Sequence, residues 1–522
     1  MMKRRNRVWI VLAIVAAVAV AACVALHVIV STRLLRRWVN GNPKELLLDY
    51  EAASSWVPGV IEARGLTMRG SDPNVQWYFR MEKATITFSP FDLLHKQFHA
   101  TSVRAHGLIF RLREKQEKSE LSAAHSARLP AIPGFSDPPL KDETRKPPPS
   151  RAEAKRAYWS VFVENLVADP TPDIWIEIYR FRGHARIAGG FLLRPHIQAR
   201  VGPAAVDFLS GDFLLAPGDT MLASASGHAD CVIDPYDPEK VQGPEVWRKI
   251  SGTIRTRGRI EDLRYLNYYL RHSPEPRFSG GGGTGTFAVR FDHGVGRGTA
   301  GFDVGRVVAR YSDGTLRGQA SGRLTVPHWD VERNDMEISG SHVALADIAT
   351  TGTKHDEREW WGRFDIVSGH LHEGLSARTA VACRDARPLY TLVETKLPGW
   401  AEGILKLDGM KGTARVRFAD KLIDVEEIDA SGGKFHIAGR YRQEQKQRRG
   451  AFLIETGPLA VGVAIDGLGS HVKLLGAKKW FREEQPTPSP PAGGSGGSPP
   501  ADFRAGRDRR SRLAKRAAGR PG

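Results

Sequence analysis

Residues Lys83–Phe88 read KATITF, and this stretch decides the fold class because polar and apolar side chains alternate along it. The apolar side chains of Ala84, Ile86 and Phe88 would share one face of a strand, and the lysine and threonines between them the other face. The same period extends from Val60 onward and returns in Val103–Leu112. The stretch therefore predicts β-strands with one apolar and one polar face.

Similar short segments, bounded by Gly, Asp or Pro, recur along the chain: Trp159–Val167, Ile174–Ile187, Thr253–Ile260, Thr286–Phe291, Gly301–Tyr311, Gln319–Val326, Met336–Leu345 and Ala414–Phe418. Such spacing is typical of a sandwich, a barrel or an elongated sheet. The pattern of a strand, a glycine and a second strand recurs, but without the strict period of a propeller or a β-helix. Two short helices are expected, at Asp262–Leu270 and Arg387–Lys396. The chain is therefore predicted to be mostly β.

The N-terminal segment Val8–Val30 has no formal charge over 23 residues, which is long enough for a helix to cross a membrane. Basic residues flank it on both sides, with a weak bias that favours a cytoplasmic N-terminus. We interpret it as a signal anchor that exports the rest of the chain. A cleavable signal peptide and lipidation at Cys23 are the alternatives. His27 lies near one end of the span and is interpreted as having no special role.

Three further regions have distinct compositions. Asn42, Pro43 and Glu45 form a helix start, so a short amphipathic helix is expected up to Val57. Residues 113–156 hold ten basic, seven acidic and seven Pro residues, which predicts a disordered insertion whose deletion leaves the fold intact. The Pro, Gly and Ser residues of the C-terminal segment, followed by basic ones, predict a disordered tail.

The net charge of +18 is concentrated at the two ends. Residues 1–40 carry seven basic and no acidic side chains, and residues 486–522 carry eight basic and two acidic ones, so the ends hold +13. This distribution favours contact with anionic lipid head groups over nucleic acid.

No combination of residues predicts an enzyme, a metal site or a cofactor. The pairs His95/His99 and His370/His372 lack the Glu of a zinc-protease helix, and Gly280–Gly285 lacks the Lys-Ser/Thr of a phosphate loop. Asp234, Asp237 and Glu239 are expected to be solvated loop residues. Cys231 and Cys383 could pair in an oxidising compartment, but two free thiols are the expected state.

Two stretches carry a resemblance to a known family. The segments PGVIEARGLTMRG (Pro58–Gly70) and ATITFSPFDLLHKQFHATSVRAHGLIFRLR (Ala84–Arg113) resemble the N-terminus of AsmA-like proteins, relatives of TamB. The segments Leu397–Phe418, Ile428–Tyr441 and Gly450–Gly467 resemble the end of AsmA-like domains. The resemblance covers about 34–112 and, more loosely, 158–481.

The resemblance implies a repeating β-groove: a twisted antiparallel sheet curled into a trough whose apolar inner face holds acyl chains. Such proteins are implicated in moving phospholipid between inner and outer membranes, or in outer-membrane maintenance. The alternating strands fit this expectation, and they would equally build a closed core. The candidate groove-lining residues are Ile86, Phe88, Val161, Val163, Ile174, Ile176, Ile178, Ile338, Val416 and Phe418.

Two functions are therefore carried forward. The first is a lipid conduit in the bacterial inner membrane, with phospholipid, the membrane and outer-membrane or periplasmic proteins as partners and no nucleic acid. The second is an assembly factor for outer-membrane proteins with a closed β core. Under the first, Ile176→Asp or Ile338→Asp should leave a folded protein. The expected regions are the cytoplasmic start and anchor, the juxtamembrane helix, the first β region, the disordered insertion, the main β-groove and the tail: 1–31, 32–57, 58–112, 113–156, 157–481 and 482–522.

Overall fold

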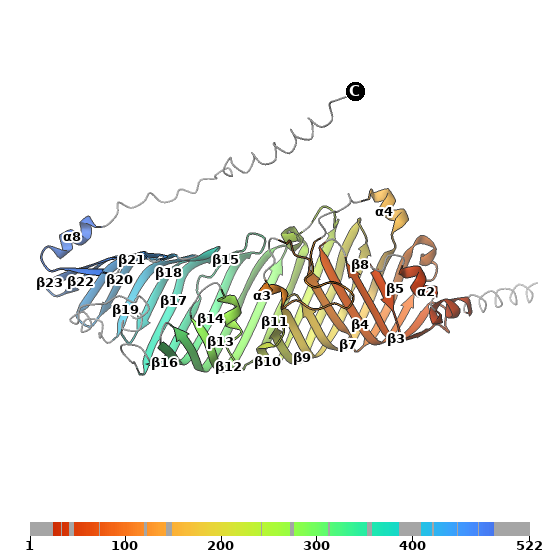
Figure 1. Cartoon of the computed structure of the whole chain (residues 1–522), viewed down its shortest axis with the longest axis horizontal. Coiled ribbons are helices and arrows are strands. Elements are labelled where there is room, and N and C mark those ends of the chain that lie inside the picture. Colours follow the sequence, from red (N-terminus) through yellow and green to blue (C-terminus); the bar gives the residue numbers. More distant parts are fainter. Residues whose placement is uncertain are drawn as a thin grey trace, which may run out of the picture.

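The computed structural model describes residues 24–484 apart from 33, 41–45, 72–73, 119–122, 142–148, 242, 272–275, 312–313, 352–357, 386–408, 420–421, 446 and 468. Its main feature is a mixed, largely antiparallel sheet of 24 strands. The strands follow one another along the long axis of the molecule in sequence order (Figure 1). Of the expected architectures, the elongated sheet is the one observed, and the mostly-β prediction is confirmed.

The strands are β1 (Leu46–Asp49), β2 (Ala52–Ser54), β3 (Val60–Ser71), β4 (Val75–Phe88), β5 (Gln97–His106), β6 (Ile109–Glu114), β7 (Ser160–Ile176), β8 (Tyr179–Arg194), β9 (Gln198–Leu215), β10 (Asp219–Tyr236), β11 (Ile250–Ile260), β12 (Arg277–Asp292), β13 (Val295–Tyr311), β14 (Gly314–Asp330), β15 (Asp335–Glu337), β16 (His342–Thr351), β17 (Trp360–Leu371), β18 (Gly374–Cys383), β19 (Met410–Ala419), β20 (Leu422–Gly432), β21 (Phe435–Glu444), β22 (Gln447–Thr456), β23 (Leu459–Asp466) and β24 (Gly469–Lys473). Three pairs of short strands each occupy one position in the sheet: β1 and β2 pair with β3, β5 and β6 with β4, and β15 and β16 with β14.

Neighbouring strands of the described sheet are antiparallel at every position but one. Strands β5 and β6 pair with β7 in parallel. A parallel neighbour requires the chain to return to the opposite edge before the next strand begins. Residues 115–159 make this return, and we call them the crossover segment. They include the helices α3 (Ala123–Ser126) and α4 (Arg151–Ala157), the second with a Ser150/Glu153 capping box.

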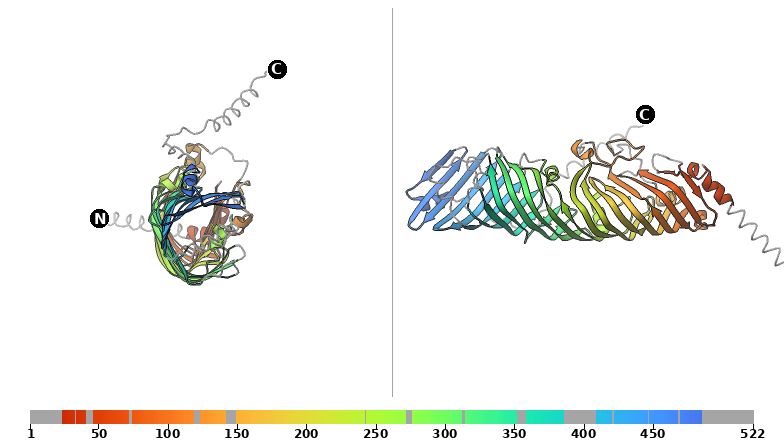
Figure 2. Two further views of the ribbon diagram at one scale, coloured as in Figure 1. Left: turned by 90° about the vertical axis from the view of Figure 1, so that its left-hand side faces the viewer. Right: turned by 90° about the horizontal axis from the view of Figure 1, so that it is seen from below.

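The sheet is curved rather than flat, and its ribbons follow a bent path when the molecule is viewed along its length (Figure 2). β-bulges accompany this curvature, because an extra residue bends a strand and increases its twist. Ser224, Arg306, Asp347 and Glu427 all have positive φ, and each lies within a shift of strand register. Bulges therefore recur along the sheet and not at a single corner.

Helices are short and lie at the margins of the sheet. Besides α3 and α4, the described helices include α2 (Leu34–Val39), α5 (Leu266–Tyr269), α8 (Ala477–Glu483) and the 3₁₀ helices η1 (Asp92–His95) and η2 (Gly243–Lys249). Residues 24–31 are also helical, and the His27 ring lies 3.8 Å from the Trp56 ring. Within the described residues, no helix has both the length and the apolar character needed to span a membrane. Residues 8–23, which form most of the predicted span and include Cys23, lie outside the described residues.

The predicted helix up to Val57 is wrong, because Leu46–Asp49 and Ala52–Ser54 form strands β1 and β2. Pairing with the edge of β3 supplies backbone partners that outweigh the local capping signal, whose residues 42–45 lie outside the described residues. Tyr50, between the two strands, is buried, and its hydroxyl donates to the Val30 carbonyl at 2.6 Å.

The prediction of disorder across residues 113–156 is wrong for the parts that the structure describes. Arg113 belongs to β6 and its side chain is fully buried, while Leu129 and Ile132 of the crossover segment are also buried. Composition misled here because the segment buries few apolar groups and instead satisfies polar groups of the sheet. The predicted tail from residue 485 onward lies outside the described residues.

Three predicted strands contain breaks. Val103–Leu112 divides at Gly107, Ile174–Ile187 turns at Glu177 and Ile178, and Met336–Leu345 divides near Gly340. In each of them the apolar residues alternate on both sides of the break but change between even and odd residue numbers across it. Of the two predicted helices, the first shortens to α5, and Arg387–Lys396 lies outside the described residues.

Candidate functional site

One lateral row of residues crosses the sheet without a polar side chain. Residues directly opposed in neighbouring strands point to the same face of a sheet. The row, which we call the apolar ladder, runs through Gly258, Gly285, Phe302, Gly322, Val343, Phe364, Val381, Gly412, Ala430, Ile437, Ile454 and Val461, from β11 to β23.

A second row of the same character runs parallel to it on the same face. It consists of Ile260, Gly283, Val304, Ala320, Leu345, Gly362, Cys383 and Met410. We call the face that carries both rows the apolar face. Burial raises the pKa of the Cys383 thiol to about 11, so this side chain is neutral and behaves as an apolar group. Cys231 and Cys383 are both free thiols.

The apolar face continues into the N-terminal half through three contiguous clusters. Ile86 packs against the cluster around Ala84 and against the cluster around Val103, and Ile187 joins the first of these to the cluster around Phe181. Phe213 of this last cluster pairs with Leu222, which packs against Ile260 in the second row. The apolar face is therefore continuous from β3 to β23.

Large side chains on this face remain partly open to solvent. Phe287, Leu324 and Val343 expose 39% and Phe418 exposes 40%. Within the described residues, the other elements that cover part of this face are short, such as α5 beside Ile260. The face therefore combines buried side chains, such as Val304 and Cys383, with these partly exposed ones.

Glycines let the large side chains lie flat along the apolar face. A Cβ atom at Gly322 would stand 2.8 Å from the Phe302 ring and 2.7 Å from the His342 carbonyl oxygen. A Cβ at Gly362 would stand 2.3 Å from the Trp360 ring. Glycine therefore leaves room for the Phe302 ring over the neighbouring strand and for the Trp360 ring along its own strand.

One residue away along each strand, the opposite face carries polar side chains at most positions and Gly or Ala at the others. Its matching row, the polar ladder, runs through Arg257, Thr286, Gly301, Arg323, His342, Asp365, Ala380, Thr413, Asp429 and Ala438. The carboxylates of Asp292 and Asp234 accept hydrogen bonds from His293 and raise its pKa, and the carboxylate of Asp429 does the same for His436. These charged pairs keep the face hydrated, whereas α8 covers its last strands through Phe481.

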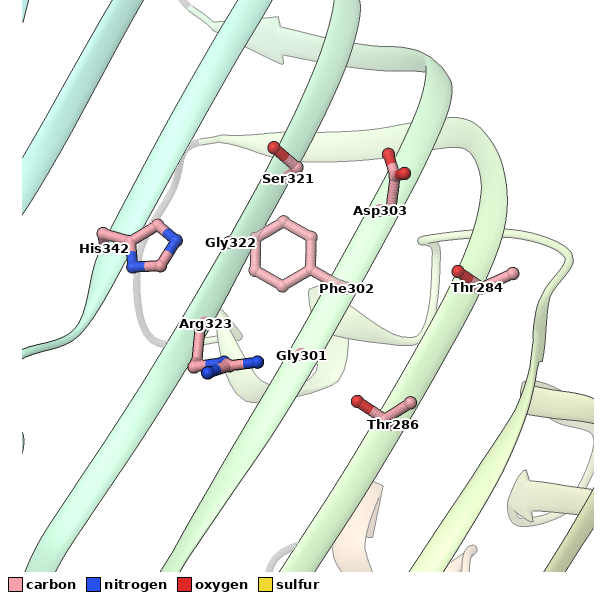
Figure 3. A pocket seen from close by; sticks show the side chains of 9 residues that line it. All are labelled: Thr284, Thr286, Gly301, Phe302, Asp303, Ser321, Gly322, Arg323 and His342. Atoms are coloured by element: carbon pink, nitrogen blue, oxygen red, sulfur yellow. The ribbon is translucent and has the colours of Figure 1, made fainter.

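The polar face also contains a shallow hollow of about 350 Å³. Figure 3 shows Thr284, Asp303, Ser321, Arg323 and His342 around it, on neighbouring strands. It lies over Gly301, where a side chain is missing from the polar face, and Phe302 and Gly322 also line it. Among the described residues, no group of three or more His, Cys, Asp or Glu side chains is placed to hold a metal ion.

Most of the predicted groove-lining residues lie on the apolar face. Ile86 and Phe88 lie on β4, Val161, Val163, Ile174 and Ile176 on β7, and Val416 and Phe418 on β19. Two predicted residues lie elsewhere.

Ile178 is in the turn after β7, where it packs against Leu129 and Leu215. Ile338 lies between β15 and β16 and exposes only 5% of its surface, so it is a structural residue and a poor probe of an open face.

The residues that sequence reasoning missed are those whose alternation is interrupted by glycine. Phe302, Val343, Phe364 and Val381 lie in the middle of the apolar ladder, where Gly322 separates Phe302 from the other three and Gly412 follows Val381. The alternation within each strand was visible in the sequence. The lateral register that joins these residues was not, because bulges shift it at several strands.

The crossover segment borders the apolar face at one edge of the sheet. The Arg113 guanidinium donates to the carbonyl oxygens of Pro130 at 2.8 Å and Ser136 at 3.0 Å, to Gln76 Oε1 at 2.9 Å and to Asp137. Farther along, Leu129 contacts Tyr265 and Tyr268 of the α5 region. The segment therefore runs from the polar side of β6 around the edge to the apolar side.

No known protein family matches this chain, and neither a curated protein nor a solved structure has significant similarity to it.

Proposed function

We propose that the chain is a membrane-anchored lipid conduit, in which the apolar face lines the concave side of the curved sheet and shields phospholipid acyl chains from water. The proposal places it with the AsmA-like proteins that its sequence resembles. Its residues 8–30 would anchor it in the bacterial inner membrane with the N-terminus in the cytoplasm. The sheet would then lie in the periplasm, where it contributes to phospholipid transport toward the outer membrane or to outer-membrane homeostasis.

The observation that carries the proposal is the unbroken apolar ladder, together with the partial exposure of the large side chains beside it. Removing one methylene group from water is worth roughly 0.8 kcal/mol. An acyl chain that lies along the face would therefore gain several kcal/mol while its head group stays in water. A continuous apolar row would let the acyl chain move along the sheet without passing a polar side chain. Such movement needs no catalytic group.

The dimensions of the sheet agree with this role. Strands in a sheet lie about 4.8 Å apart, so a sheet of this many strands extends on the order of 100 Å. The face would therefore offer a path much longer than a single lipid. A closed core, as an assembly factor would have, gives no reason for exposed aromatic and aliphatic side chains along its whole length.

Phe418 and Arg417 provide a matched test, because they are adjacent, both exposed and on opposite faces of β19. A photo-crosslinking amino acid is placed at either position in the full-length protein in cells. We expect lipid adducts at position 418 and at least tenfold fewer at position 417, measured by mass spectrometry of the purified protein.

Equal lipid labelling at the two positions, or none at 418 in a folded protein, would reject the conduit. Protein adducts at 418 in place of lipid would favour the assembly factor. Thermal melting of both variants supplies the folding control.

A further inference from the structure

The most exposed large apolar side chains gather at the two ends of the sheet. Six of them expose 67% or more: Trp56, Phe91, Leu94, Leu459, Leu474 and Leu475. Within the described residues, the remaining large apolar side chains expose 58% or less. The first three lie between β2 and β5 and the last three between β22 and α8, so none lies in the middle of the sheet.

One member of the N-terminal group contacts the helical residues 24–31. The Trp56 ring lies 3.8 Å from the His27 ring, between centroids. Exposed aromatic and aliphatic side chains beside a membrane anchor are typical of residues that enter the lipid interface. The proposed membrane therefore accounts for this group.

The C-terminal group has the same exposure without a neighbouring anchor. Leu474 and Leu475 expose 70% and 94%, and they directly follow the last strand, β24. In Figure 1, α8 and β23 lie at the end of the sheet opposite to α2. Two adjacent leucines held this far into solvent cost free energy unless something apolar receives them.

Basic side chains surround the two leucines. Lys473 precedes them, and Lys478, Lys479 and Arg482 of α8 follow, all of them exposed. Lys478 pairs with Glu455 at 2.6 Å and Lys479 with Glu483 at 3.9 Å, so Lys473 and Arg482 carry the excess positive charge of the tip. Exposed leucines with basic neighbours match the chemistry of an anionic bilayer, whose head groups are negative and whose acyl region is apolar.

The tip is also next to the end of the apolar ladder. Lys473 pairs with Gly462, the residue after Val461, where the ladder ends. A bilayer at the tip would therefore meet the apolar face directly. The buried side chains Ala477 and Phe481 hold α8 against β22 and β23, so the leucines are presented from a fixed position.

We infer that the C-terminal end of the sheet, through Leu474 and Leu475 with the surrounding basic residues, is a docking surface for an anionic lipid bilayer separate from the one that holds the N-terminus. The inference names the second membrane contact of the proposed conduit. The inference rests on the proposed function only for the identity of the second membrane. Docking itself does not require an acyl chain to lie on the apolar face.

The full-length protein is placed in phosphatidylcholine nanodiscs and mixed with vesicles that contain phosphatidylglycerol. We expect the parent protein to capture these vesicles in a flotation assay. Leu474→Asp with Leu475→Asp should reduce capture at least tenfold. Val367→Asp is the matched control, because Val367 is 57% exposed but lies on β17, and it should not change capture.

The neutral variant Leu474→Ser with Leu475→Ser separates docking from folding, since both side chains are exposed and its melting temperature should match the parent's. Capture by both double variants at the parent's level would assign docking to another region, such as the basic residues after 485, and overturn the inference. Equal capture of pure phosphatidylcholine vesicles would overturn the anionic requirement. Lost capture with intact lipid crosslinking at 418 would support the docking surface independently of the conduit.

Discussion

At the scale of single residues, Glu177 is a carboxyl group in a turn of the sheet whose pKa is raised by burial. It lies at the turn between β7 and β8 with positive φ, and its carboxylate accepts a hydrogen bond from the Glu114 backbone N–H. Burial raises the pKa of Glu177 to about 7, although this hydrogen bond lowers it. The folded protein therefore holds this proton more tightly than the unfolded chain, in which the pKa is about 4.5.

This difference predicts a pH effect with a defined sign. Between pH 4.5 and 7 the folded state binds more protons than the unfolded state, so the stabilising contribution of Glu177 falls as pH rises and stays low above 7. Glu177→Gln cannot ionise. Relative to the parent, we expect it to gain about 2 kcal/mol in stability on going from pH 4.5 to pH 8.

Melting temperatures of the parent and Glu177→Gln at both pH values measure this gain. Histidines with raised pKa, such as His293, contribute equally to both proteins and cancel in the comparison. An unchanged difference between the two proteins at both pH values would show that the carboxyl group ionises normally.

At the scale of elements, the crossover segment is held to the sheet at several points, through Arg111, Arg128 and the buried Arg113. The Arg113 guanidinium satisfies two carbonyl groups of the segment and Gln76 of β4. Its side chain is fully buried, and its hydrogen bonds to Gln76 and the Pro130 carbonyl are buried with it. The segment is therefore a structural part of the sheet edge, and deleting it would expose polar groups that it now satisfies.

Arg113→Ala should consequently destabilise the protein by roughly 3–5 kcal/mol, because buried polar partners lose their hydrogen bonds. Limited proteolysis should show cleavage within residues 123–141 before the sheet unfolds. The control is Arg323→Ala, which removes an exposed guanidinium on the polar face. Identical protease patterns for the parent and Arg113→Ala would contradict this role.

At the scale of the whole molecule, the apolar face depends on continuity across strands. A single carboxylate in the apolar ladder would interrupt the apolar face. Whether the protein still folds depends on how exposed the substituted position is. Val343 exposes 39% of its surface, so an aspartate there can reach water. Ile338 exposes 5%, so an aspartate there would be buried without a partner.

We therefore expect Val343→Asp to remain folded but to lower phospholipid transfer between vesicles about tenfold. His342→Asp, on the polar face next to it, should transfer lipid like the parent. Ile338→Asp should lose several kcal/mol of stability and fail to fold, which revises the expectation from sequence. Circular dichroism melting and a fluorescent lipid transfer assay distinguish these outcomes. Normal transfer by folded Val343→Asp would show that lipids do not pass along this ladder.

The sequence by itself determined the mostly-β class, the two-faced character of strands such as Lys83–Phe88, and eight of the residues on the apolar face. These properties follow from side-chain alternation, which is local and can be read along the chain. The tertiary structure decided which residues stand beside one another across strands. In the tertiary structure, Leu46–Asp49 forms a strand and not the expected helix. The described parts of the crossover segment contact Arg113, and Ile338 is buried. Register, bulges and edge pairing act between residues far apart in sequence, so no local pattern specifies them.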